Sequence, residues 1–132
     1  MFGFSRGAMS CRILSNLIYT AGIVDMTTNK SNRSKRHLAK KIYKNYRQKD
    51  KSLLERRRLV ADFIARKKLK LSAGDTVKIG FMGLWDTVDD IGWPSDWTEK
   101  DFDSPDPLHL YQICNVNKIY HAMALDDNRA RL

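Results

Sequence analysis

Apolar side chains recur at helical spacing near the amino-terminal end of the chain. Between residues 6 and 21 they fall at three- and four-residue intervals, which predicts an amphipathic helix: Met9, Ile13, Leu14, Leu17, Ile18 and Ala21. Gly22 follows directly, and glycine commonly closes a helix because it adopts left-handed backbone angles without strain. The stretch 25–36 is polar and shows no apolar rhythm, so we expect a surface loop there.

Two more amphipathic helices are predicted in the middle of the chain. The first has one apolar stripe, made of Leu38, Ala39, Ile42, Tyr43 and Tyr46. The second is expected to direct inward Leu53, Leu54, Val60, Phe63 and Ile64. Its basic residues are expected to point mostly outward: Arg56, Arg57, Arg58, Lys67 and Lys68. The sequence SAGD at 72–75 is typical of a turn.

One segment has the pattern of a buried strand. Residues 76–88 are apolar almost throughout without alternation, which is typical of a strand covered on both faces in a parallel sheet. We expect Gly80 and Gly83 to mark close approach of a neighbouring backbone. An acidic segment with two Trp and all three prolines follows at 89–107, and we expect a loop on the active-site side. A helix is predicted over 108–131.

Composition indicates one folded domain with an uneven charge. The chain has 132 residues, of which 42% are hydrophobic, which is enough for one modest core and excludes wholesale disorder. The net charge of +9 comes from residues 30–70, which hold 17 Lys and Arg against three acidic residues. Such a segment could bind nucleic acid or an anionic lipid surface, although no known nucleic-acid motif accompanies it. The alternative is solvated outer faces of helices.

Cysteine content and hydropathy further limit the class of protein to which the chain can belong. Cys11 and Cys114 are too few for a disulfide scaffold and lack metal spacing, so we expect reduced thiols and no metal or cofactor. No apolar run approaches the ~18 residues of a membrane span. Residues 8–24 resemble a signal-peptide core, but Arg12 and Asn16 interrupt them. We therefore expect either a cytoplasmic location or export without a cleaved signal.

The sequence Gly3-Phe4-Ser5-Arg6-Gly7 is a G-x-S-x-G pentapeptide, the pattern of the nucleophile elbow in α/β-hydrolases. In that elbow a strand meets a helix at a strained serine, and we expect both glycines to be required because a Cβ would strike the adjoining strand or helix. The helix predicted after it would point its positive dipole end at the serine. The alternative is a serine that caps a helix in a glycine-rich loop.

Asp86 lies at the end of the predicted buried strand, where open α/β sheets place catalytic groups. It follows Ser5, as in the hydrolase chain order of Ser, Asp or Glu, then His. The alternative is a strand-ending aspartate that caps the next turn. His121 comes next in that order and is the candidate base, although a lone histidine on a helix is more often structural. His37 and His109 are weaker candidates.

Three blocks together resemble one family. FGFSRGAMSCRILSNLIYTAGIV, IGFMGLWDTVDDIGWP and IYHAMALDDNRARL resemble, in order, successive motifs of the type VI secretion phospholipase-effector catalytic domain. Their counterparts in the family are G-F-S-R-G-A, G-x-W-D-T-V and H-A-x-A-L-D-E-x-R, and Asp127 stands in place of the usual Glu. KKIYKNYRQKD is similar to the family's intervening Tyr-Arg helix. The resemblance spans nearly the whole chain.

The resemblance implies an α/β-hydrolase fold with esterase or phospholipase chemistry on a phospholipid or other ester. It assigns Ser5 as the nucleophile, Asp86 as the acid, and the Arg6 backbone amide as an oxyanion donor. His121 matches a family histidine. The base is expected in a downstream Gly-x-His-Ser-Asp-Val-Gly-Gly block, and the alternative is a reduced triad of Ser5, Asp86 and His121.

Two family blocks have no counterpart here: that Gly-x-His block and an Asp-Gly-Thr strand carrying the second oxyanion donor. We therefore expect a partial α/β-hydrolase domain, truncated at both ends, with its missing segments elsewhere or on another chain. It would comprise an elbow and helix at 1–24, a basic helical insert at 25–71, and a strand, acidic loop and helix at 72–132. Alone it is expected to be weakly active or inactive. The alternative function is a basic helical binding module for nucleic acid or anionic membranes.

Overall fold

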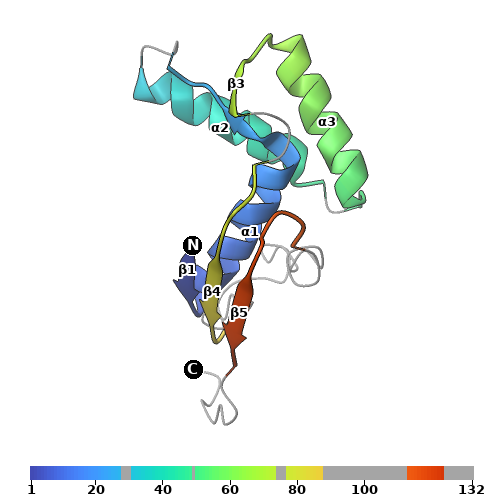
Figure 1. The fold of residues 1–132 in the computed structure, drawn as a ribbon. Helices are drawn as coiled ribbons and strands as arrows, with labels where there is room; N and C mark the ends of the chain where they lie inside the picture. The colour runs from blue at the N-terminus through green and yellow to red at the C-terminus, as the bar shows by residue number, and fades with distance from the viewer. Residues whose placement is uncertain (28–30, 49, 74–76, 88–112, 124–132) are drawn as a thin grey trace, which may run out of the picture.

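A parallel sheet of three strands with a helix packed on it forms one half of the molecule (Figure 1). The computed structural model describes residues 1–27, 31–48, 50–73, 77–87 and 113–123. The strands are β1 (Phe2–Phe4), β4 (Met82–Trp85) and β5 (Ile119–Ala122), in the order β1-β4-β5. Helix α1 (Arg6–Ala21) follows β1 and packs against β1 and β4. This is the α/β class with a parallel sheet that the sequence predicts.

The other half is helical. Helices α2 (Asn32–Tyr46) and α3 (Leu53–Arg66) pack against each other and against α1. A short antiparallel pair joins this half to the sheet, formed by β2 (Ile23–Val24) and β3 (Leu71–Ala73). Figure 1 shows α1 running from the sheet to the crossing of α2 and β3, so that one helix takes part in both halves.

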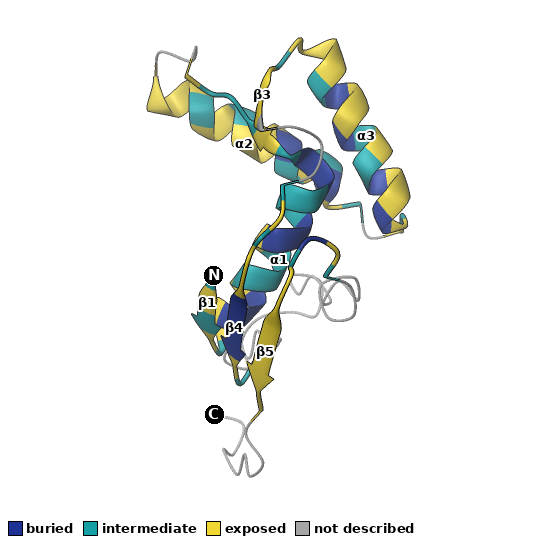
Figure 2. Ribbon diagram, viewed as in Figure 1, coloured by how far each residue is buried: buried dark blue, intermediate teal, exposed yellow. Residues whose placement is uncertain are grey.

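Each half has its own apolar core. The helical core consists of Ala21, Ile42, Tyr46, Leu53, Val60 and Phe63. The sheet core consists of Ala8, Met82 and Leu84, between α1 and the sheet. Figure 2 shows buried residues along α1, which contributes Ala21 to the helical core and Ala8 to the sheet core, while much of α2 and α3 is exposed. Among the described helices, none is long and apolar enough to cross a lipid bilayer.

The predicted first helix is confirmed at both ends. It spans Arg6–Ala21, and Gly22 follows with φ 65° and donates its N–H to Ile18 O at 2.8 Å. Only glycine adopts such angles without strain. Both predicted thiols are also confirmed as free, since Cys11 and Cys114 form no disulfide.

The helix predicted over 108–131 is wrong where the structure describes it. Residues 113–123 contain a strand, β5, and an isolated bridge between Ile79 and Val116. The apolar residues in this segment are spaced as in an amphipathic helix, but its backbone pairs with the edge of β4 instead. Met82 N–H donates to Lys118 O at 2.9 Å. Strand pairing with this distant segment therefore determines the structure here, and the helical spacing of the apolar residues does not. The predicted loop at 89–107 lies outside the described residues.

Three predicted boundaries also change. The expected loop 25–36 ends early, because α2 begins at Asn32 behind Ser31, whose side chain accepts the Ser34 N–H at 3.1 Å. The first turns of α2 are exposed, so they need no apolar rhythm. Of the expected turn 72–75, the first two residues belong to β3. Of the expected strand 76–88, continuous pairing covers Met82–Trp85.

The inward stripe of α3 differs from the prediction at two positions. Arg56 is fully buried, whereas Leu54 is 59% exposed. Residue 56 falls on the same helical stripe as Leu53 and Val60. Its guanidinium is accommodated because Nε donates to the carbonyl of Lys51 at 2.9 Å and the group lies over an aromatic ring of the helical core.

The glycines of the buried strand behave differently from the prediction. Gly80 has nothing within 4 Å of an added Cβ. At Gly83 an added Cβ would lie 2.9 Å from the rings of Phe2 and Trp85. The close neighbours of Gly83 are thus side chains rather than backbone, and they belong to an exposed aromatic group on the sheet face opposite α1.

Candidate active site

Ser5 occupies the sharp junction between β1 and α1. Its backbone angles are φ 53° and ψ −123°, a region that non-glycine residues rarely adopt and that persists only when the surroundings fix it. Three backbone hydrogen bonds fix it here: Ser5 N–H donates to Trp85 O at 2.9 Å, and Ser5 O accepts the N–H groups of Ala8 at 3.0 Å and Met9 at 3.3 Å. The strained geometry is therefore held by both the neighbouring strand and the helix.

The two glycines of the pentapeptide are not equivalent. An added Cβ at Gly3 would lie 2.4 Å from Gly7 O and 2.6 Å from Ala8 N, so β1 and the first turn of α1 approach too closely for any other residue. Gly7 has nothing within 4 Å of an added Cβ. The expectation that both glycines are sterically required is confirmed for Gly3 and wrong for Gly7, because this face of α1 points away from the described strands.

Asp86 follows β4 directly and lies beside Ser5. The register pairs Phe4 with Trp85, so Ser5 and Asp86 are the next residues on adjacent parallel strands, which run about 4.8 Å apart. Asp86 has φ 46°, and its N–H donates to Ala122 O at 2.8 Å. Both residues are partly exposed. The structure thus brings together the two residues that the sequence selected 81 positions apart.

The first turn of α1 starts immediately after the serine. Arg6 is its first residue, and the amide groups at a helix start have no acceptor within the helix. No acidic side chain lies in this first turn, so none of its own side chains offsets the positive end of the helix dipole. The positive end of the α1 dipole, which includes the Arg6 N–H, therefore favours a negative charge beside Ser5.

His121 lies near the end of β5, opposite Leu84 in the register. Its Nδ1 is 3.3 Å from Arg12 Nη2, and its Nε2 is 2.9 Å from Thr87 Oγ1. The pKa of His121 lies below its ordinary value because the ring is partly desolvated and because Arg12 repels the charged form, while Asp86 acts in the opposite direction. The structure joins His121 to Arg12 and Thr87, and no hydrogen bond to Ser5 is found among the described residues.

Sequence reasoning missed Arg12 and Thr87 as parts of this site. Arg12 stood out only as a charge that interrupts an apolar helix, and Thr87 only as the neighbour of Asp86. A partly buried arginine on a helix face that otherwise packs on a sheet could have indicated a polar partner. That partner, His121, could not be named because its segment was predicted to be helical.

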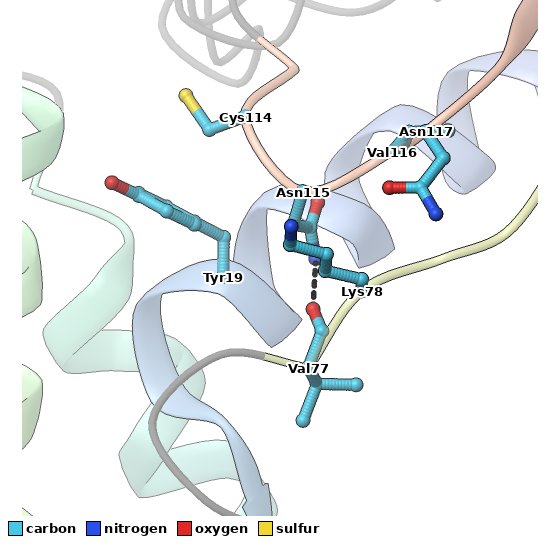
Figure 3. Close-up of a pocket in the computed structure, with 7 residues that line it drawn as sticks. All are labelled: Tyr19, Val77, Lys78, Cys114, Asn115, Val116 and Asn117. Carbon is cyan, nitrogen blue, oxygen red and sulfur yellow. Dashed lines mark hydrogen bonds between the residues drawn. The ribbon is translucent and has the colours of Figure 1, made fainter.

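A cavity of about 370 Å³ lies beside α1, away from the candidate site (Figure 3). It is lined by residues of α1 and of the segments before β4 and β5, among them Tyr19, Val77, Lys78, Cys114 and Asn115. Asn115 Nδ2 donates to Val77 O at 3.4 Å across it. Because the strands are parallel, this cavity lies toward their amino ends, away from Ser5 and Asp86. In the described part of the chain, no group of three or more metal-ligating side chains is found.

Comparison with known proteins identifies the family. The model of the family described as "T6SS, Phospholipase effector Tle1-like, catalytic domain" matches residues 1–132, which confirms the resemblance drawn from the three sequence blocks. Comparison with curated proteins found no significant match, and comparison with solved structures found none either. The chain belongs to the Tle1-like phospholipase effector family of type VI secretion.

Proposed function

We propose that this chain carries the nucleophile and the acid of a serine hydrolase that cleaves phospholipid esters, on part of an α/β-hydrolase fold. The single observation that carries the proposal is the position of Ser5, in its strained junction at φ 53°, and of Asp86, which directly follow the paired residues Phe4 and Trp85 of adjacent parallel strands. Membership of a phospholipase effector family supports a lipid substrate. The strand-serine-helix geometry supports the nucleophile elbow interpretation.

In the proposed mechanism, Ser5 Oγ forms a bond to the ester carbonyl carbon while its proton passes to a general base. The Arg6 backbone N–H donates to the oxygen that becomes negative in this step. The bond to the alcohol then breaks, and the base returns the proton to that alcohol. Water adds to the acyl-enzyme in the same way and releases the fatty acid and Ser5.

Asp86 is proposed to orient the general base and to stabilise its charged form. The family's Gly-x-His-Ser-Asp block, in which that base is expected, has no counterpart in this sequence. We therefore expect the 132 residues alone to hydrolyse lipid esters weakly or not at all. A rapid Ser5-dependent burst of ester cleavage by these residues alone would contradict this expectation.

The test of the proposed function uses the natural protein, with whatever sequence flanks these residues in its gene. Release of fatty acid is measured from vesicles of phosphatidylcholine and phosphatidylglycerol. Ser5→Ala is expected to lower the rate by roughly 10³-fold or more. Ser10→Ala is the matched control, because Ser10 lies on the same helix and its exposed hydroxyl donates to a carbonyl of that helix, Arg6 O. Hydrolysis that survives Ser5→Ala would overturn the proposal.

A second function is favoured by the charge on the two outer helices. Much of α2 and α3 is exposed (Figure 2), and the exposed positions of both helices include many Lys and Arg residues. We propose that this basic surface, the exposed Lys and Arg residues of α2 and α3, attracts the protein to anionic lipid, with each charge near a membrane contributing about 1 kcal/mol. Nucleic acid is the alternative ligand.

The matched substitutions for this surface are Lys41→Glu on α2 and Lys118→Glu beside β5, both at exposed lysines. Binding to phosphatidylglycerol vesicles is measured by co-sedimentation over a series of salt concentrations. We expect Lys41→Glu to weaken binding several-fold, Lys118→Glu to have little effect, and Ser5→Ala to have none. Equal effects of the two lysine substitutions would contradict the proposal, and tighter binding to RNA or DNA than to vesicles would favour the alternative.

A further inference from the structure

Three elements of the fold meet at the imidazole of His121. The residue itself belongs to β5, Arg12 belongs to α1, and Thr87 follows the end of β4. The ring contacts both partners, at 3.3 Å through Nδ1 and at 2.9 Å through Nε2. Helix α1 begins next to Ser5, and Thr87 comes directly after Asp86. This bridge therefore connects the helix that follows Ser5 with the turn that contains Asp86.

The two contacts determine which ring nitrogen carries the proton. A guanidinium is always charged and only donates hydrogen bonds, so Nδ1 of His121 must accept from Arg12 Nη2 and cannot carry a proton. In a neutral imidazole the other nitrogen then holds the hydrogen. Nε2–H therefore donates to Thr87 Oγ1, whose lone pairs are available to accept it.

The charges around the ring favour the same state. Among the described residues, the charged groups that act on His121 are Arg12, which opposes protonation of the ring, and Asp86, which favours it. Desolvation also opposes the charged form, and the pKa of His121 is lowered as a result. A protonated ring would place two cationic N–H donors face to face at Nδ1, which is repulsive.

This arrangement bears on the proposed triad. A general base must offer an unprotonated nitrogen to the serine hydroxyl. The only lone pair on the neutral ring is at Nδ1, where Arg12 occupies it. His121 could accept the proton of Ser5 only after breaking that contact.

We infer that His121 is a positioning residue: as a neutral Nε2–H imidazole between Arg12 and Thr87, it holds the turn of Asp86 against the helix that follows Ser5. The turn is also tied to β5 by its backbone, through Asp86 N–H and Ala122 O at 2.8 Å. The side-chain bridge adds a link to α1. This inference rests on the proposed function for the catalytic roles of Ser5 and Asp86, but not for the state of the ring.

The ring state is tested directly by nuclear magnetic resonance on the chain labelled with ¹⁵N-histidine. Long-range correlations between ring hydrogens and nitrogens distinguish the two neutral forms from the cation, and His121→Asn identifies the signals of His121 among the three histidines. At pH 7 we expect a neutral ring with Nε2 protonated and Nδ1 unprotonated. A cationic ring, or a neutral ring with Nδ1 protonated, would overturn the inference.

The link to Asp86 is tested at Thr87, which leaves the imidazole of His121 and its contact with Arg12 in place. Thr87→Val removes the hydroxyl and keeps the shape, whereas Thr87→Ser keeps the hydroxyl and serves as the control. The amide resonance of Asp86 is followed in both variants and in His121→Ala. We expect Thr87→Val and His121→Ala to shift or broaden it similarly and Thr87→Ser to leave it nearly unchanged. No change in Thr87→Val would contradict the positioning role.

Hydrolysis by the natural protein separates positioning from base catalysis. A misplaced acid is expected to cost roughly 10- to 100-fold, so Thr87→Val and His121→Ala should reduce the rate by similar factors. If His121 were the base, its removal should cost up to about 10⁴-fold while Thr87→Val cost little, and the inference would be wrong. Hydrolysis insensitive to Ser5→Ala would refute the proposed function instead, and the resonance measurements would still decide the ring state.

Discussion

The close approach of β1 to the first turn of α1 makes Gly3 and Gly7 an informative pair for substitution. In Gly3→Ala the new Cβ would lie 2.4 Å from Gly7 O and 2.6 Å from Ala8 N. Both obstacles are backbone atoms, so no side-chain rotation relieves them. Reaching an ordinary contact of about 3.4 Å requires α1 to move by roughly 1 Å, and packed interiors resist such shifts.

The magnitude follows from the cost of forcing extra atoms into a packed site, about 1–3 kcal/mol. With a urea dependence of about 1–3 kcal/mol per molar for small proteins, the midpoint of unfolding should fall by about 1 M. In Gly7→Ala the added methyl meets nothing within 4 Å, and alanine favours a helix over glycine by up to about 1 kcal/mol. That variant should be as stable as the parent chain or more stable.

The assay is urea unfolding followed by circular dichroism, with both variants measured beside the parent chain. We expect the urea midpoint of Gly3→Ala to lie clearly below that of Gly7→Ala. Equal midpoints for the two variants would refute this expectation, because they would show that the close approach of strand and helix does not constrain residue 3. A Gly7→Ala variant less stable than Gly3→Ala would refute it more strongly.

Further predictions concern the buried arginine, the histidine and their surroundings. Arg56→Ala should destabilise the chain by about 1–3 kcal/mol, because it removes buried packing and the hydrogen bond that Arg56 donates to the Lys51 carbonyl. Arg58→Ala, at an exposed position of the same helix, should change the free energy of unfolding by no more than about 0.5 kcal/mol. Urea unfolding compares the two variants, and equal losses of stability would contradict the burial of Arg56. Because the pKa of His121 is lowered in the folded state, the folded state binds fewer protons than the unfolded state. The contribution of His121 to stability is therefore present above the unfolded pKa of about 6.5. It is lost as the pH falls through the folded pKa. The unfolding midpoint should therefore drop between pH 7.5 and pH 5.5 by more in the parent chain than in His121→Asn, and an identical pH dependence of the two would show that the pKa is not lowered.

The elements predicted well from the sequence are those whose own residues determine them. Helix α1 was predicted with both ends because its apolar side chains recur at helical spacing and Gly22 closes it. The end of the buried strand at Asp86 was also predictable, since Met82 and Leu84 are covered completely. In these segments the local pattern and the tertiary environment favour the same structure.

The segment of β5 shows why other elements could not be predicted. All four of its residues are exposed, so no burial pattern distinguishes the strand from a helix. Its structure depends on pairing with β4, some 35 residues away in the sequence, with Met82 opposite Ile119. Pairing between distant segments leaves little trace in the hydrophobic pattern of an exposed strand.

The candidate site was predictable only where its residues carry a local sequence signal. Ser5 and Asp86 each carry a local signal, a glycine-flanked junction and a strand end, and the parallel pairing of β1 with β4 brings them side by side. The bridge from Arg12 through His121 to Thr87 has no local signal, because its three members lie on α1, β5 and the turn after β4. It could be recognised only once β5 was in register with β4.

The most direct test of the central claim is covalent labelling of the natural protein with a fluorophosphonate, with the modified residue located by mass spectrometry. We expect an adduct on Ser5 and a labelling rate that falls by about 10³- to 10⁴-fold in Asp86→Asn. Asp62→Asn, at an exposed carboxylate of α3, is the matched control. An adduct on another residue, or labelling of Ser5 that is as fast in Asp86→Asn as in Asp62→Asn, would contradict the central claim.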